Sequence, residues 1–176
     1  MIWVTADHHF GHHKDGGGSI LNYENRPFKT ISEMDEALIE AWNHVVAKRG
    51  DTVYHLGDFS FYPKAKTQEI LARLHGNKIL IMGNHDTARS RSWWLDVGFA
   101  QAIGTPILLD SFFILSHEPV YLNMSMPYAN LHGHLHSKTL VGGAYLNVGV
   151  DAVGWAPISF EQAKARVRLV STTSVS

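Results

Sequence analysis

The chain has 176 residues, of which 45% are hydrophobic, and a formal net charge of −1. This length and hydrophobic fraction suit one folded domain with a substantial core and exclude a disordered chain. The near-neutral charge argues against a broad surface for duplex DNA. The lack of cysteine excludes disulfides, thiolate metal sites and thiol nucleophiles.

Apolar segments of the sequence are all shorter than the roughly 20 residues that cross a bilayer. The first apolar run begins at residue 2 without a basic segment before it, so we expect no signal peptide. These features predict a cytoplasmic protein that does not bind a membrane. With no repeat or linker, we expect a single domain over residues 1–170 and a disordered tail over residues 171–176.

The first half of the sequence predicts alternating strands and helices. Residues 1–6 are expected to form a central strand, and residues 10–30, which include three consecutive glycines, a long flexible loop. Apolar residues recur at helical spacing over residues 32–48, where Ser32 and Asp35 resemble a capping box. Strands are expected at residues 51–56 and 79–82, and helices over residues 63–74 and 90–97.

After residue 98 the pattern changes to short strands separated by turns. They are expected at residues 99–103, 107–109, 112–115, 129–132, 144–148 and 166–170. The sequence therefore predicts an α/β protein that starts as βαβ units and finishes as an antiparallel meander.

Five of the apolar runs end abruptly in residues that are suited to bind metals. These ends are Asp7-His8-His9, Gly57-Asp58, Gly83-Asn84-His85-Asp86, Ser116-His117 and Gly133-His134-Leu135-His136. The chain has 12 histidines, and at least six of them lie in these clusters. Taken singly, each residue has an ordinary explanation as a turn cap or a packed histidine. Because strand ends of an α/β sheet share an edge, the joint pattern favours one metal site of nitrogen and oxygen ligands.

The order Asp-x-His, Gly-Asp, Gly-Asn-His-Asp, His and Gly-His-x-His resembles the calcineurin-like metallophosphoesterase family, especially its small members without a cap domain. The resemblance runs from residue 7 to about residue 150 and departs from the family pattern in the glycine-rich stretch at residues 16–18. It implies a four-layer α/β/β/α sandwich with two mixed β-sheets.

The resemblance also implies a pair of divalent metal ions. Asp58 is expected to bridge them, with Asp7, His9 and His136 completing the first metal shell and Asn84, His117 and His134 the second. Mn²⁺ is the favoured ion because a mixed imidazole and oxygen shell suits six-coordinate metals, with Fe, Ni²⁺ and Zn²⁺ as alternatives.

Catalysis is implied for His85, which would protonate the leaving group or stabilise the phosphoryl oxygens, with Asp86 orienting its ring. Arg26, Arg89 and Tyr128 are weaker candidates for substrate contacts, because guanidinium matches phosphate and an aromatic ring can stack on a base. For each of them, a surface or packing role is the alternative. His8, His12, His13 and His132 are expected to orient the metal ligands.

The implied activity is that of a dinuclear-metal-dependent phosphoesterase in which a metal-bridging hydroxide attacks phosphorus. An open site without a cap favours a phosphodiesterase for a nucleotide-type or other small phosphodiester, or for a nucleic-acid end. The alternatives are a phosphomonoesterase or nuclease of the same fold, and a metal-binding scaffold protein without activity.

Overall fold

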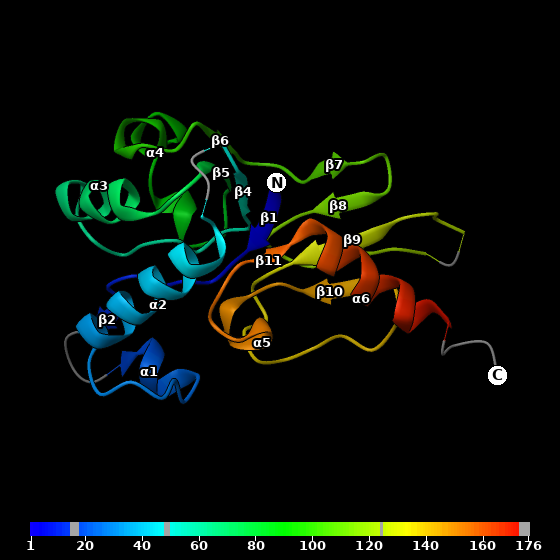
Figure 1. Ribbon diagram of the computed structural model, residues 1–176, viewed down its shortest axis with the longest axis horizontal. Helices are drawn as coiled ribbons and strands as arrows, with labels where there is room; N and C mark the ends of the chain where they lie inside the picture. The colour runs from blue at the N-terminus through cyan, green and yellow to red at the C-terminus, as the bar shows by residue number, and fades with distance from the viewer. Residues whose placement is uncertain (15–17, 48–49, 124, 173–176) are drawn as a thin grey trace.

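Two mixed β-sheets form the centre of the computed structural model, which describes residues 1–14, 18–47, 50–123 and 125–172 (Figure 1). The larger sheet has the order β11-β1-β4-β5-β6. In it, β1 (Ile2–Thr5), β4 (Thr52–His55), β5 (Asn77–Ile81) and β6 (Gln101–Ile103) are parallel, and β11 (Ile158–Ser159) is antiparallel to β1.

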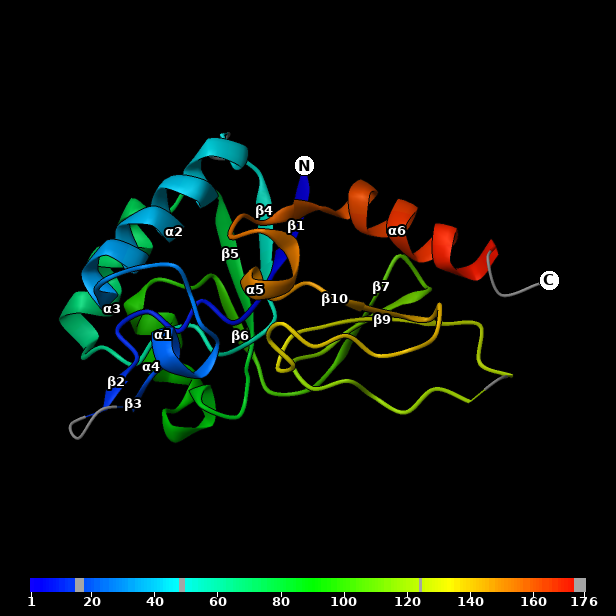
Figure 2. The ribbon, with the colours of Figure 1, turned by 90° about the horizontal axis from the view of Figure 1, so that it is seen from below.

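The smaller sheet has the order β10-β9-β8-β7. Its strands β8 (Phe113–Leu115), β9 (Ala129–His132) and β10 (Tyr145–Asn147) are parallel, and β7 (Ile107–Leu109) is antiparallel to β8. Figure 2 shows the two sheets from below, with the larger one toward the left and the smaller one toward the right.

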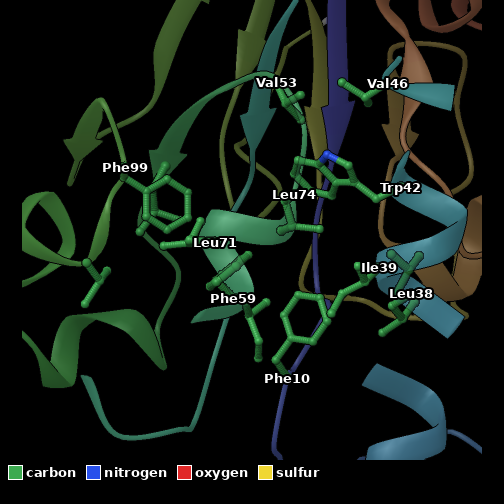
Figure 3. Packing of buried hydrophobic residues seen from close by; sticks show 14 of the residues in the cluster. Phe10, Leu38, Ile39, Trp42, Val46, Val53, Phe59, Leu71, Leu74 and Phe99 are labelled. Atoms are coloured by element: carbon green, nitrogen blue, oxygen red, sulfur yellow. The ribbon is translucent and has the colours of Figure 1, made fainter. Parts of the chain in front are cut away.

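Helices cover the larger sheet on the face away from the smaller sheet. These are α2 (Ile31–Val45), α3 (Lys64–Arg73) and α4 (Arg91–Val97) (Figure 1). Trp42 of α2, Leu71 of α3 and Val53 of β4 belong to the hydrophobic core between these helices and the sheet (Figure 3). A second core joins both sheets to α6 (Phe160–Thr172). The expected sandwich with two mixed sheets is confirmed.

The start of α2 differs from the predicted capping box. Thr30 is the N-cap and accepts a hydrogen bond from the Glu33 amide, while the Glu33 carboxylate accepts one from the Lys29 amide. Asp35 instead is buried and accepts a hydrogen bond of 2.8 Å from the Tyr62 hydroxyl. The cap therefore lies two residues earlier than predicted, and it differs from a capping box because Glu33 binds the amide of Lys29 and not that of the N-cap.

The predicted antiparallel meander is wrong, because β6 pairs in parallel with β5 and the strands β8, β9 and β10 pair in parallel with one another. Only β7 and β8 form the expected antiparallel hairpin. Short strands look alike in sequence whichever way they run. The long connections after β8 and β9 give the chain enough length to return to the same end of the sheet.

The strand predicted at residues 166–170 is also wrong, since these residues belong to α6. Phe160, Ala163 and Val167 are buried at helical spacing, which is the signal that identifies the helix. Because α6 ends at Thr172, the first two residues of the predicted tail are helical, and residues 173–176 lie outside the described part of the chain.

The predicted loop at residues 10–30 contains short regular elements. They are β2 (His13–Lys14), β3 (Gly18–Ser19) and α1 (Ile20–Tyr23), while residues 15–17 lie outside the described ranges. A further short helix, α5 (Val150–Val153), follows β10. Within the described residues, no helix is long and apolar enough to cross a membrane.

The topology places many strand ends at one point. The carboxyl ends of β1, β4 and β5 share one edge of the larger sheet because these strands are parallel. The ends of β8, β9 and β10 share an edge of the smaller sheet for the same reason. A bridge between Ala6 and Gly149 joins the two edges.

Candidate metal centre

The structure brings the seven predicted metal ligands together where the two sheet edges meet. Asp7 follows β1, Asp58 follows β4 and Asn84 follows β5, while His117 and His134 follow β8 and β9. His9 and His136 lie in the loops that continue from Asp7 and His134. Each of these residues has a ligand nitrogen or oxygen atom within 5 Å of a ligand atom of at least one other.

One group of ligands consists of Asp7, His9 and His136, whose ligand atoms all lie within 4.8 Å of one another. Both ring nitrogens of His9 are buried and have no hydrogen-bond partner among the described residues. A buried imidazole whose two nitrogens both lack a partner is costly, which favours a bound group that the protein chain does not supply. A metal ion fits that description.

A second group consists of Asn84, His117 and His134. The Asn84 Oδ1 atom lies 2.9 Å from His117 Nε2 and 3.1 Å from His134 Nδ1, and these two nitrogens are 3.2 Å apart. Nδ1 of His117 lies 2.8 Å from the Leu56 carbonyl, to which it donates, so a neutral ring presents an unprotonated Nε2 to the group. Three potential ligand atoms at about 3 Å from one another have the spacing of neighbouring ligands around a six-coordinate ion.

Asp58 lies between the two groups. Its Oδ2 atom is 3.5 Å from His9 Nε2 in the first group and 3.5 Å from His117 Nε2 in the second. Its Oδ1 atom accepts a hydrogen bond of 3.1 Å from the His85 amide. One buried carboxylate is therefore close to both ligand groups, as a carboxylate that bridged two cations would be.

Asp86 does not orient the His85 ring, and this prediction is corrected. Its carboxylate accepts hydrogen bonds from the amides of Asp58, Phe59 and Gly83, at 2.7, 3.1 and 2.9 Å. Burial raises the pKa of Asp86 to about 7, against the opposing effect of the bond from the Gly83 amide. Asp86 thus ties the end of β4 to the end of β5 and fixes the position of Asp58.

His85 lies at the mouth of the site, with its side chain 48% exposed. Its Nε2 atom is 3.9 Å from Asp58 Oδ2, and its ring packs against Phe61 and His9, with centroid separations of 5.0 and 5.7 Å. An imidazole that is open to solvent and next to the Asp58 carboxylate is placed to exchange a proton with a molecule bound there.

The backbone at the site is strained. Nine non-glycine residues in the described ranges have positive φ, and five of them are predicted ligands: Asp7, His9, Asp58, His134 and His136. Left-handed backbone costs such residues of order 1 kcal/mol each, so it persists where surrounding contacts enforce it and is typical of functional sites. Gly133 allows a further close approach, because an added Cβ there would lie 2.6 Å from Asp7 Oδ2.

Asp7→Asn is expected to stabilise the metal-free protein near neutral pH. Burial raises the pKa of Asp7 well above its ordinary value of 3.8, His136 opposes this rise, and Asp58 adds to it. Because the folded pKa is above the unfolded one, the contribution of Asp7 to stability is present at low pH and is lost as the pH rises through the folded pKa. The Asn side chain still accepts the bond from the His134 amide.

Urea unfolding in the presence of a chelator measures this effect. We expect the variant to gain about 1–4 kcal/mol near neutral pH and its advantage to shrink as the pH falls toward 4. With Mn²⁺ present, the variant should be less stable than the natural chain, since it loses a metal ligand. A variant that is less stable than the natural chain at every pH without metal would contradict the assignment.

Arg26 is buried within the protein and does not face a substrate, so its predicted substrate contact is corrected. The guanidinium donates two hydrogen bonds of 2.8 Å to the Asp151 carboxylate and others to the carbonyls of Asp7 and His8, at 2.7 and 2.9 Å. Asp151 in turn accepts a hydrogen bond of 3.2 Å from His136 Nδ1. Arg26 therefore holds the loop after β1 against the segment that orients His136.

Arg26→Ala should lower the free energy of unfolding by about 3–5 kcal/mol, because it leaves the buried Asp151 carboxylate and two carbonyls without their donor. For a chain of this size the melting temperature is expected to fall by roughly 10 °C. Thermal unfolding measures the change, with the exposed Arg166→Ala as the control that stays within about 0.5 kcal/mol. A loss of unfolding free energy as small as that of the control would show that the hydrogen bonds of Arg26 do not stabilise the fold.

The other weak substrate candidates also lie away from the ligands. Arg89 donates to the carbonyls of Ser60 and Tyr62, at 2.9 and 2.8 Å, and its guanidinium lies 4.2 Å from the centroid of the Trp93 ring. Tyr128 precedes β9, at the opposite end of this strand from His134. Their predicted roles as substrate contacts are not supported by these positions.

The remaining histidines divide between the site and the core. His12 stacks on Phe61 at 4.2 Å and lies 5.2 Å from the His9 ring, while His132 Nδ1 lies 2.8 Å from the Gly133 carbonyl. His8 instead points into the core, where its Nδ1 is 2.9 Å from His55 Nε2. His13 is exposed on β2. The prediction that His8 and His13 orient ligands is therefore wrong.

Two residues of the site were missed in the sequence. Asp151 follows the apolar strand β10 and Gly149, so it matches the pattern of an apolar run that ends in an acidic residue. Phe61 forms the ring surface under His9, His12 and His85, and its sequence context of neighbouring aromatic residues gives no sign of that role.

Comparisons with known proteins identify the family and the fold. The sequence model of a family described as calcineurin-like phosphoesterase matches residues 1–158. An uncharacterized protein from Methanocaldococcus jannaschii is 29% identical over 170 residues, which cover 91% of this chain and 87% of that protein. The crystal structure of a protein of unknown function from Aquifex aeolicus superposes with a TM-score of 0.69 at 24% identity, covering 94% of this chain and 98% of that one. This last similarity supports the fold alone.

Proposed function

Because the chain belongs to the calcineurin-like phosphoesterase family, and is thus a metal-dependent phosphoesterase, we propose that it hydrolyses phosphodiesters. We further propose that its seven clustered ligands hold two divalent ions, with Mn²⁺ as the favoured metal. The observation that carries the proposal is the position of Asp58 Oδ2, 3.5 Å from an imidazole nitrogen of each ligand group.

The chemistry that a pair of bound divalent ions supplies is a water nucleophile at neutral pH and neutralisation of charge on the phosphate. The protein holds each ligand in one geometry for this purpose. The Leu56 carbonyl fixes the tautomer of His117, and Asp151 accepts the Nδ1 proton of His136. Asp86 fixes Asp58 through the backbone, so the ligands are positioned before substrate arrives.

His85 is the proposed general acid. It is exposed enough to reach a substrate, and the Phe61 and His9 rings limit its movement. A proton held at its Nε2 can pass to the departing alkoxide as the ester bond breaks. The exposure of Asn84 and His85 supports a diester, since both ester groups of such a substrate need room beside the ligands.

Hydrolysis of bis-p-nitrophenyl phosphate tests the proposal. We expect turnover that requires Mn²⁺, stops on chelation and returns when the metal is restored, with a kcat/KM above that for the monoester p-nitrophenyl phosphate. A preference for the monoester would contradict the diester assignment. No turnover of either ester by protein that contains two ions per chain would favour a metal-binding protein without activity.

A further inference from the structure

A groove of about 420 Å³ opens beside Asn84 and His117. Its walls come from three segments: residues 81–84 and 87 at and after the end of β5, residues 104–106 after β6 and residues 116–120 after β8. Its volume is within the range of pockets that bind small organic ligands. Apart from Gly83, Asn84 and His117, no lining residue has a role in the site described above.

The groove adjoins only one of the two ligand groups. Asn84 and His117 line it and also face His134. The proposed general acid His85 packs instead against His9, in the other group, and against Phe61. A phosphodiester with its phosphorus beside Asp58 and its leaving group toward His85 would therefore direct its other ester group into the groove.

The lining of the groove indicates what that group is. Met82, Pro106 and Val120 supply apolar surface, and Thr87 and Thr105 supply hydroxyls. Glu118 is the only acidic residue among the described lining residues, and none of them is Lys or Arg. A carboxylate accepts hydrogen bonds from hydroxyls or amines and repels a second phosphate. The exposed Arg91 lies close to the groove, because its guanidinium would be 3.3 Å from a Cβ added at the lining residue Gly104.

We propose that this groove binds the ester group that remains on phosphorus, and that this group is an uncharged nucleoside. The inference rests on the proposed phosphodiesterase function and adds a substrate class to it. Apolar surface suits the base, while the threonine hydroxyls and Glu118 suit the hydroxyls of the sugar. The binding of this group explains why a diester is preferred, because a monoester has no second ester group to place there.

Two substrates with the same leaving group test the size of the retained group. Thymidine 5′-(p-nitrophenyl phosphate) carries a nucleoside, and methyl p-nitrophenyl phosphate carries only a methyl group. We expect kcat/KM to be at least about tenfold higher for the nucleoside ester. Thr105→Trp, which fills the groove from an exposed position, should reduce this ratio by about tenfold. Ala65→Trp, at an exposed position of α3, is the matched control and should leave the ratio unchanged.

A third substrate tests whether the ester group that remains on phosphorus is uncharged. Adding a 3′-phosphate to the thymidine ester should lower kcat/KM several-fold at low salt, and Glu118→Gln should remove part of this loss. A preference for the doubly charged ester would overturn the assignment of an uncharged group and would indicate that Arg91 binds the second phosphate.

Binding provides a measurement that does not depend on turnover. Calorimetric titration of thymidine 5′-phosphate into the Mn²⁺-loaded protein should give a Kd that Thr105→Trp weakens by about tenfold and Ala65→Trp does not change. If both the substrate ratio and this Kd are unaffected by Thr105→Trp, the groove inference is wrong while the phosphodiesterase stands. If no ester is hydrolysed but the Kd changes as expected, the proposed function fails and the groove is a nucleotide-binding site.

Discussion

Asp58→Asn is expected to lower kcat/KM for bis-p-nitrophenyl phosphate by about 10³-fold. The Asp58 carboxylate lies 3.5 Å from both His9 Nε2 and His117 Nε2, so it is placed to offer negative charge to both proposed ion positions. An amide of the same shape has no net charge to offset the repulsion between two cations in a buried site. Loss of one ion removes several kcal/mol of stabilisation from the transition state, which corresponds to a thousandfold in rate.

The variant should still fold, because the amide oxygen of Asn can accept the hydrogen bond that the His85 amide donates to Asp58. Asp96→Asn is a suitable control, since Asp96 is exposed and pairs only with the exposed Lys64 among the charged groups described. We expect the control to retain full activity. Activity of the Asp58→Asn variant within a few-fold of the natural chain, with folding unchanged, would show that this carboxylate bridges nothing.

His85→Ala is expected to reduce kcat/KM by about 10²–10⁴-fold for esters with an alcohol as the leaving group. An alkoxide needs a proton as it departs, and the His85 imidazole is the exposed acid beside the site. A p-nitrophenolate needs little protonation, so the loss should be only about tenfold for p-nitrophenyl esters. Because half of the side chain is exposed, the variant should keep its metal and its melting temperature.

His13→Ala, which removes an exposed histidine of β2, is the control for this comparison and should have no effect on either ester. Equal losses for both leaving groups would indicate that His85 stabilises the phosphoryl oxygens instead of donating a proton. Undiminished turnover of both would remove His85 from the catalytic residues, even with the metal site intact.

The clustering of the seven candidate ligands could be predicted from the sequence because each lies at or shortly after the end of an apolar run. In parallel strands the ends of such runs must share an edge, so Asp58 and Asn84 meet whatever the details of the loops. The left-handed backbone of Asp7 and His9 was not predictable, because it results from the contacts that enclose these residues.

The environment of the ligands depends on contacts that span the chain. Arg26 binds Asp151, which is 125 residues away in the sequence. The residues next to either of them give no sign of this pairing. Asp86 is adjacent to His85, yet it begins a short helix, Asp86–Ala88, that turns its carboxylate toward the amides of Asp58 and Gly83. Adjacency in sequence therefore gave the wrong partner for His85.

The parallel or antiparallel direction of the later strands also could not be predicted from the local sequence pattern. A stretch such as Ile107–Leu109 has the same apolar character whether its neighbour is parallel or antiparallel. The long connection between β8 and β9 allows parallel pairing, and this pairing brings His117 and His134 to the same edge. Both histidines were assigned to one site from the sequence, but the direction of their strands was not predicted.

The number and coupling of bound metal ions test the central claim most directly. Protein loaded with Mn²⁺ and freed of excess metal by gel filtration should contain two ions per chain by mass spectrometry. Its electron paramagnetic resonance spectrum should be that of an exchange-coupled pair, because Asp58 would be shared between the ions, and Asp58→Asn should abolish the coupling. A single ion per chain, or two ions with the spectrum of isolated Mn²⁺, would contradict a site built around one bridging carboxylate.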